Sequence, residues 1–432
     1  MTAQVIATRR PVIDTDPEAS LAMHRALDED VTEALLSDRD RSVRDRVREI
    51  AAHEIAPLAA DTDATKRFAE PGYQALARAG LAGLIFPERL GGSGHSTVAY
   101  AAAMEEITAA CPATSLIYMT QTHAAYPILL AGGPGLAERY IPGLLNGSVY
   151  GSLAITEPNA GSDVSSLATA ARRVGAHYLI NGSKTFITTG DRAHVIVCFA
   201  TTDRSAKRAG VSAFVVEGDL PGVDRGNPLG KLGMHGSSTA ELFFTDVRVP
   251  VANRLGPEGG AWRIVMSAVI KSRISAAAQG VGIARGAYAH ALAELTHRHG
   301  PTLPADIAAR LAEMRGRIVQ ARLLLLATAA QVDRLDAAGP AAPGAAKLDA
   351  PLPTAAIGIM KQQCTDVGVE IAAAAVRALG PEGDRRELGV ERYLRDALVT
   401  QIYDGTNDIQ RMLIARDTIT RLTQVLNGGQ PE

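Results

Sequence analysis

The sequence contains few cysteines, and this shortage restricts the class of protein. Among its 432 residues there are three, Cys111, Cys198 and Cys364, which lie far apart and lack the spacing of metal ligands. Such a sparse, odd set argues against a disulfide framework and is typical of a reduced, cytoplasmic protein. We therefore expect a cytoplasmic location and no metal site.

Long apolar runs and an excess of one charge are also missing. No run of about 18 apolar residues occurs, as a membrane-spanning helix requires. The 44 basic and 46 acidic side chains leave a net charge of -2, which argues against a nucleic acid or an anionic membrane as partner. In contrast, 47% of the residues are hydrophobic, enough to form a sizeable core. The length predicts two or three structural units.

The apolar pattern divides the chain into four segments. We expect a flexible, polar arm over residues 1–32, a helical domain over 33–150, a β-domain over 151–255 and a second helical domain over 256–432. Helical spacing of apolar residues marks the first and last domains, and short β-branched runs mark the middle one.

Finer patterns predict the elements of the last two domains. Asn181-Gly182 separates two strand-like runs and predicts a hairpin with a type I′ turn. Residues 337–353 are rich in proline and alanine and predict a surface loop. The last domain contains four alanine-rich amphipathic stretches, which predict a four-helix bundle, at about 260–297, 304–336, 354–379 and 390–425.

The segment between Thr156 and Asp163, TEPNAGSD, is rich in short hydrogen-bonding side chains. Gly161 permits close backbone approach, and Thr156 and Ser162 are able to bind the polar edge of a ligand. The alternative is a connecting turn that these hydroxyl groups stabilise.

A second segment, Lys184 to Gly190, contains Phe186 and Thr188 two residues apart. On a strand they share one face, which suits stacking and hydrogen bonding to a flat cofactor. The alternative is a core phenylalanine beside a structural threonine.

A third segment contains Asp404-Gly405-Thr406, which interrupts a helical pattern with a carboxylate beside a glycine. A carboxylate buried by a ligand can act as a general base. The alternative is an Asx turn or an N-cap for the last helix.

Together, and in this order, the three segments resemble the acyl-CoA dehydrogenase family from about residue 34 to 425. Lys231-Leu232-Gly233 and Asp246–Pro250 add to the resemblance. It implies a mainly α fold with a central β-barrel domain: a helical domain, the β-barrel and a four-helix bundle, with FAD between barrel and bundle.

The resemblance also implies roles for individual residues. Asp404 occupies the place of the catalytic glutamate, although its side chain is one methylene shorter. Residues at cofactor-binding positions are Thr156, Ser162, Phe186, Ile187, Thr188, Thr406 and Asp408, and residues at substrate-binding positions are Ser162, Arg273, Gly405 and Arg416.

One FAD contact of the family is replaced here. Thr296 stands where the family usually has an arginine that reaches the FAD pyrophosphate across a subunit interface. We expect Arg377 to take over this contact, because its planar guanidinium offers several donors.

The activity implied is FAD-dependent α,β-dehydrogenation of an acyl thioester, carried on CoA or on a carrier protein. The family also implies electron-transferring flavoprotein as acceptor and a homodimer or homotetramer. Two alternatives are a flavin oxidase of the acyl-CoA oxidase or nitroalkane oxidase type, and a catalytically silent homologue that serves as an oligomeric partner.

Overall fold

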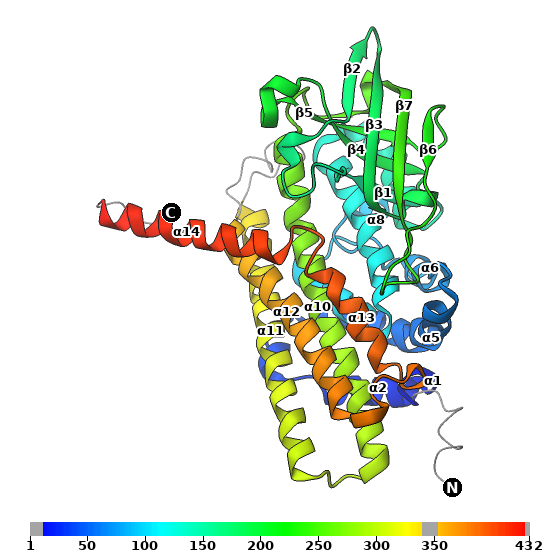
Figure 1. Ribbon diagram of the computed structural model, residues 1–432, viewed down its shortest axis with the longest axis vertical. Coiled ribbons are helices and arrows are strands. Elements are labelled where there is room, and N and C mark those ends of the chain that lie inside the picture. The colour runs from blue at the N-terminus through cyan, green and yellow to red at the C-terminus, as the bar shows by residue number, and fades with distance from the viewer. Residues whose placement is uncertain (1–11, 339–352, 428–432) are drawn as a thin grey trace.

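The computed structural model describes residues 12–338 and 353–427, and it places one open sheet at the end of a long body of helices (Figure 1). The loop predicted over 337–353 lies almost wholly outside the described residues. No helix in the described ranges has both the length and the apolar character needed to cross a membrane.

The N-terminal part is helical, and short turns connect its elements. Ser37 and Asp40 form a capping box that begins α4. Every residue of α7 is buried, and so is all of α8 except Tyr126, Leu129 and Ala131. The helices are α1 (Val12–Thr15), α2 (Pro17–Ala26), α3 (Asp30–Glu33), α4 (Asp38–Ile50), α5 (Ala56–Thr65), α6 (Glu70–Arg78), α7 (Thr97–Ala110), α8 (Pro112–Ala131) and α9 (Gly133–Leu145), with a π-helical turn at Ala51–Ile55.

The first residues differ from the flexible arm predicted over 1–32. Described residues 12–32 form helices that pack against the body, and Ile13 and Leu21 are buried. Asp14 lies 3.0 Å from Nε2 of His290 on α10. Polar composition suggested an arm, but these polar side chains have partners far away in the sequence.

Eight strands form the sheet. Its order is β6-β7-β3-β2-β4-β5-β8, and β1 pairs in parallel with β4 outside this path. The path begins at β6 and ends at β8 without closing, so the predicted barrel is not confirmed. The strands are β1 (Gly151–Ala154), β2 (Ala170–Val174), β3 (His177–Thr188), β4 (Val195–Thr201), β5 (Val211–Glu217), β6 (Val223–Arg225), β7 (Thr239–Pro250) and β8 (Arg254–Leu255).

The hairpin predicted at Asn181-Gly182 is wrong, because β3 runs through both residues without reversing. The pairing of β3 with β7 shifts register at this point instead. Asn181 Nδ2 donates to Asp246 Oδ1 at 2.9 Å, and Asp246 N donates to Asn181 Oδ1 at 2.9 Å. The Asn-Gly pair is therefore a bulge held by a side-chain bridge between two strands.

The C-terminal part consists of α10 (Ala261–His299), α11 (Ala305–Ala338), α12 (Thr354–Ala378), α13 (Val390–Thr400) and α14 (Asn407–Leu426). Helices α10 to α13 lie side by side, whereas α14 projects away from them (Figure 1). The helical stretch predicted over 390–425 consists of two helices, because residues 401–406 form a turn between α13 and α14, and the interruption predicted at Asp404-Gly405-Thr406 lies in this turn.

Small residues bring α10 and α12 close together. A Cβ atom on Gly280 would lie 2.4 Å from the carbonyl oxygen of Cys364, and one on Gly368 would lie 2.9 Å from the carbonyl oxygen of Gly280. These glycines are therefore required by helix packing.

Candidate active site

The turn between α13 and α14 contains Asp404 and Gly405. Both have a positive φ, 56° and 88°, in the turn where the chain changes direction between the two helices. A Cβ atom on Gly405 would lie 2.7 Å from Nε2 of Gln410 and 3.4 Å from Nη2 of Arg273, so a side chain there would strain the turn and displace Gln410. Nε of Arg273 donates to the carbonyl oxygen of Asp404 at 3.3 Å.

The Asp404 carboxylate has an unsatisfied oxygen. Oδ2 is buried and has no hydrogen-bond partner, and the same holds for Nη1 of Arg273 nearby. Buried polar atoms without partners are rare because each one costs free energy. Two of them at one turn indicate a site prepared for a ligand.

A second buried cation lies near Asp404. Nζ of Lys361, on α12, donates to Oδ1 of Asn407 at 2.8 Å. Burial lowers the pKa of Lys361 to about 8, although the charge of Asp404 opposes this change. Burial also lowers the pKa of Arg273, again against the charge of Asp404. Asp404 therefore lies within the electrostatic reach of two cations.

Tyr403 and Thr406 fix the two sides of the turn. The Tyr403 hydroxyl donates to Oε1 of Gln279, whose Nε2 donates to Ser115 Oγ at 2.8 Å. The Thr406 hydroxyl accepts from the backbone N–H of Ile409 at 3.3 Å and so caps α14. The N-cap interpretation therefore holds for Thr406, which leaves the Asp404 carboxylate free for another role.

On the sheet, Phe186 is the unusual residue. Its side chain is 68% exposed and its φ is 56°, a backbone conformation that bulky residues rarely adopt. The register of β3 against β7 shifts between Lys184 and Ile187, which turns Phe186 outward while Ile187 stays buried. Thr188 is half-buried. The core interpretation of Phe186 is therefore wrong.

The TEPNAGSD loop is attached to this strand. The Thr156 carbonyl accepts from the backbone N–H of Thr185 at 2.9 Å. The buried Glu157 carboxylate accepts from Nζ of Lys184 at 2.7 Å and from the backbone N–H groups of Ala168 and Thr169. Burial opposes ionisation of Glu157, but the Lys184 ammonium outweighs it and lowers its pKa. Ser162, at the tip of the loop, is exposed.

Known proteins match nearly the whole chain. Three family models cover it in order: acyl-CoA dehydrogenase N-terminal domain (residues 37–148), middle domain (152–247) and C-terminal domain (259–419). An acyl-CoA dehydrogenase of Bacillus subtilis is 38% identical over 379 residues, which cover 87% of this chain and 96% of that protein.

Solved structures agree. Butyryl-CoA dehydrogenase from Megasphaera elsdenii superposes with a TM-score of 0.81 at 31% identity, covering 89% of this chain and 99% of the other. A structure described as PigA with FAD and proline superposes with a TM-score of 0.81 at 25% identity, covering 89% and 99%. The chain belongs to the acyl-CoA dehydrogenase family.

The structure can be compared with what this family requires, which is a site for FAD. The exposed Phe186 ring, on a strained backbone, fits a flat ligand that would cover the ring. The TEPNAGSD loop, which is rich in hydroxyl groups, is hydrogen-bonded to the same strand. Within the described ranges, no cluster of three or more His, Cys, Asp or Glu side chains could hold a metal ion.

The remaining residues predicted from the family lie apart from one another. Asp408 is exposed on α14 and pairs with Arg411 at 3.0 Å, and Arg416 is exposed farther along that helix. Arg377 is exposed at the C-terminal end of α12, which lies at the end of the helical body away from the sheet (Figure 1). One chain therefore brings Arg273, Asp404, Gly405 and Thr406 together, but not Arg377.

Sequence reasoning did not identify Lys361, Gln279 or Tyr403 as residues around the Asp404 turn. Lys361 gives no clear signal, because it ends the apolar run 355–360 and is followed by the polar residues Gln362 and Gln363. Gln279 and Tyr403 give none either, because their relation depends on how α10 packs against the turn.

Proposed function

We propose that this acyl-CoA dehydrogenase family member introduces a double bond between Cα and Cβ of an acyl thioester. The protein is a flavin oxidoreductase, and FAD when bound supplies the acceptor for the β-hydride. The observation that carries the proposal is the buried, unpartnered Oδ2 of Asp404 in a turn between Arg273 and Lys361.

Asp404 is the proposed base. Its unpartnered oxygen is free to accept the α-proton, and proton abstraction requires an oxygen within about 2.6–3.2 Å of the group that loses the proton. The positively charged side chains of Arg273 and Lys361 attract the negatively charged Asp404 carboxylate. We propose that the left-handed turn brings this side chain within reach, although it is one methylene shorter than glutamate.

The proposed residues around FAD are those of the loop, the strand and the cap: Thr156, Ser162, Phe186, Ile187, Thr188, Thr406 and Asp408. The exposed Phe186 ring supports a stacking role. Gly405 contributes its backbone N–H toward the thioester carbonyl, and Arg273 and Arg416 are the proposed substrate contacts. The ion pair of Glu157 with Lys184 positions the loop.

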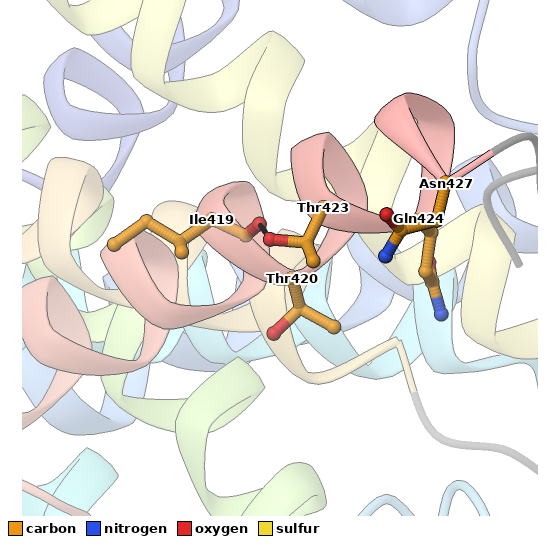
Figure 2. Close-up of a pocket in the computed structure, with 5 residues that line it drawn as sticks. All are labelled: Ile419, Thr420, Thr423, Gln424 and Asn427. Atoms are coloured by element: carbon orange, nitrogen blue, oxygen red, sulfur yellow. Dashed lines mark hydrogen bonds between the residues drawn. The ribbon is translucent and has the colours of Figure 1, made fainter.

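We propose further that the active protein is a homodimer or homotetramer. Helix α14 exposes five large apolar side chains, Met412, Ile419, Leu422, Val425 and Leu426. A shallow hollow on the same helix is lined by Ile419, Thr420, Thr423, Gln424 and Asn427 (Figure 2). Such exposed apolar surface is typical of a protein–protein interface. A second copy is also the simplest way for Arg377 to reach FAD.

The electron acceptor and the location complete the proposal. Electron-transferring flavoprotein is the proposed acceptor, and CoA or a carrier protein the proposed thioester carrier. A cytoplasmic location is supported by Cys111, Cys198 and Cys364, which are free and buried.

The experiment is an anaerobic visible spectrum of the FAD-loaded protein, before and after addition of short-chain acyl-CoAs. Bleaching of the yellow flavin by an acyl-CoA supports the proposal. The Asp404→Asn variant keeps the side-chain shape and should bleach at least about 100-fold more slowly, since a general base contributes on that order. A flavin-loaded wild type that no acyl thioester bleaches, on CoA or on a carrier protein, would overturn it. Peroxide formed in air would assign the oxidase reaction instead.

A further inference from the structure

A cavity of about 200 Å³ lies where the N-terminal helices meet the sheet. Its walls come from three segments: the turn between α5 and α6, the turn that follows β3, and the connection between β6 and β7. The described residues that line it include none of those proposed above for FAD or substrate. We call this second, separate site the junction cavity.

The wall of the junction cavity is positively charged. Lys66, Arg192 and Lys231 line it, and within the described ranges no carboxylate does. Nε and Nη2 of Arg192 donate to Oδ2 of Asp191 at 3.1 and 2.8 Å. These bonds use two of the five N–H groups of a guanidinium. The guanidinium also lies over the Phe68 ring, 4.1 Å from its centre, and this contact fixes its position across the junction.

Lys231 carries a buried ammonium group at the same wall. Its Nζ donates to the carbonyl oxygen of Ser237 and, at 3.2 Å, to Oγ1 of Thr239. An ammonium has three donors, so these two acceptors leave one N–H for a ligand. Burial lowers the pKa of Lys231 to about 8, although the charges of Asp396 and Asp191 oppose this change. An anion in the junction cavity would favour the charged ammonium further.

Ser237 is the residue that points to a ligand. It lines the junction cavity and is only 1% exposed, yet its hydroxyl has no hydrogen-bond partner in the described part of the chain. A buried hydroxyl left without a partner costs free energy, and a ligand in the cavity would supply one. His235, on the same wall, is already engaged: its Nε2 lies 2.9 Å from the carbonyl oxygen of Lys231, and its Nδ1 lies 2.9 Å from Oδ1 of Asp63.

We propose that the junction cavity binds a small oxyanion, either inorganic phosphate or the phosphate group of a small monoester. Lys231, Ser237 and Arg192 donate to its oxygens, and Lys66 adds a further positive charge. Three lining cations without a lining carboxylate favour a dianion over a singly charged carboxylate. Lysine and arginine are the usual side chains that bind phosphate. The ligand bridges the N-terminal helices and the sheet.

The test is calorimetric titration of inorganic phosphate into the FAD-loaded protein at constant ionic strength, so that FAD occupies its own phosphate-binding groups. We expect saturable binding of one phosphate per chain and weaker binding of acetate. Ser237→Ala should weaken phosphate binding by about fivefold, as the loss of one hydrogen bond does. Lys231→Met should weaken it by about tenfold or more, because hydrogen bonds from a charged donor are stronger.

Ser152→Ala is the matched control for Ser237→Ala. Ser152, on β1, is also buried, and its hydroxyl also lacks a partner among the described residues, but it does not line the junction cavity. This variant should bind phosphate as the wild type does. Both alanine variants remove an unsatisfied hydroxyl, so neither should impair folding.

Two results would overturn the inference. One is no saturable phosphate binding by the wild type, and the other is equal phosphate affinity in the wild type, Ser237→Ala and Lys231→Met. Acetate binding more tightly than phosphate would also overturn it, and would assign the junction cavity to a carboxylate instead. All titrations are made without a thioester substrate, so their outcome is independent of the proposed dehydrogenase function.

Discussion

Two residues of the candidate site, Asp404 and Phe186, have a left-handed backbone that their side chains disfavour. This conformation costs about 1–2 kcal/mol for a residue with a Cβ atom. Hydrogen bonds of Arg273 and Tyr403 stabilise the Asp404 turn. The Phe186 ring, in contrast, is exposed and gains little from packing that would offset its strain. The strain at Phe186 therefore indicates a function that depends on the position of its ring.

For Phe186→Gly we expect two opposite changes. The apoprotein should gain about 1 kcal/mol of unfolding free energy, because glycine adopts the positive φ without strain. Affinity for FAD should fall by roughly fivefold, since stacking of one aromatic ring contributes about 1 kcal/mol. Denaturant unfolding of the apoprotein and titration of FAD fluorescence measure the two effects. Unchanged FAD affinity would contradict a stacking role for Phe186.

Gly405→Ala should impair the base through the backbone. Its Cβ atom would meet Gln410 and the conformation has a positive φ, so we expect a loss of about 1–3 kcal/mol of unfolding free energy. We also expect kcat to fall by about 100-fold, because a displacement of the Asp404 carboxylate by about 1 Å has an effect of that order.

Gly80→Ala is the matched control for Gly405→Ala. Gly80 also has a positive φ, of 71°, but a Cβ atom there would meet nothing within 4 Å. This variant should lose stability through strain while kcat stays unchanged. An equal fall of kcat in both variants would show that the Gly405 turn has no special part in catalysis.

At the scale of elements, a buried network of charges joins the N-terminal helices to α10. Arg48 on α4 and Arg285 on α10 both pair with Glu106 on α7, at 2.8 and 2.9 Å. His24, on α2, is buried beside them. Burial lowers its pKa from 6.5 to about 3, Arg285 and Arg48 add to this decrease, and Glu106 opposes it.

This network predicts loss of stability in mild acid. His24 is neutral in the folded protein, whereas the unfolded chain takes up its proton below pH 6.5. The contribution of neutral His24 to the free energy of unfolding is therefore fully present above pH 6.5. It is lost as the pH falls from 6.5 toward 3, at up to about 1.4 kcal/mol per pH unit. Urea unfolding at pH 7.5, 6.0 and 5.0 measures this slope.

His24→Leu should make the slope between pH 6.5 and 5 shallower by roughly one proton. The control is His53→Leu, which replaces a largely exposed histidine and should leave the slope as it is in the wild type. If the slope of His24→Leu equals that of the wild type, another group causes the acid sensitivity.

At the scale of the whole molecule, α14 provides the test of assembly. The double variant Ile419→Asp, Leu422→Asp places two charges in its exposed apolar face. We expect sedimentation analysis to show a smaller species than the oligomer proposed for the wild type, because burying an unpaired charge at an interface is costly. Leu58→Asp, at an exposed leucine on α5, is the control and should sediment like the wild type. A wild type that sediments as a monomer would contradict the proposed oligomer.

The sequence predicted the class of fold because its evidence is local: helical spacing, β-branched runs and three compact motifs. It predicted the interruption at Asp404-Gly405-Thr406 but not that α14 projects away from the other helices there, and it did not predict the bulge at Asn181-Gly182. Both depend on contacts between segments far apart in the chain, such as Arg273 with Asp404 and Asn181 with Asp246. The residues around Asp404, such as Arg273 on α10 and Lys361 on α12, come from different helices, and no spacing along the chain relates them.

The break between α13 and α14 places Asp404 only three residues before Asn407, the first residue of α14. Movement of the projecting helix is therefore transmitted to Asp404, the proposed base, through Gly405 and Thr406. In the proposed oligomer, a second copy packed against α14 would also hold Asp404 in place, whereas the turn of a separated chain would be less well defined. For the proposed oligomer, dilution below its dissociation constant should thus reduce the specific activity, which would tie the activity to the concentration of the protein.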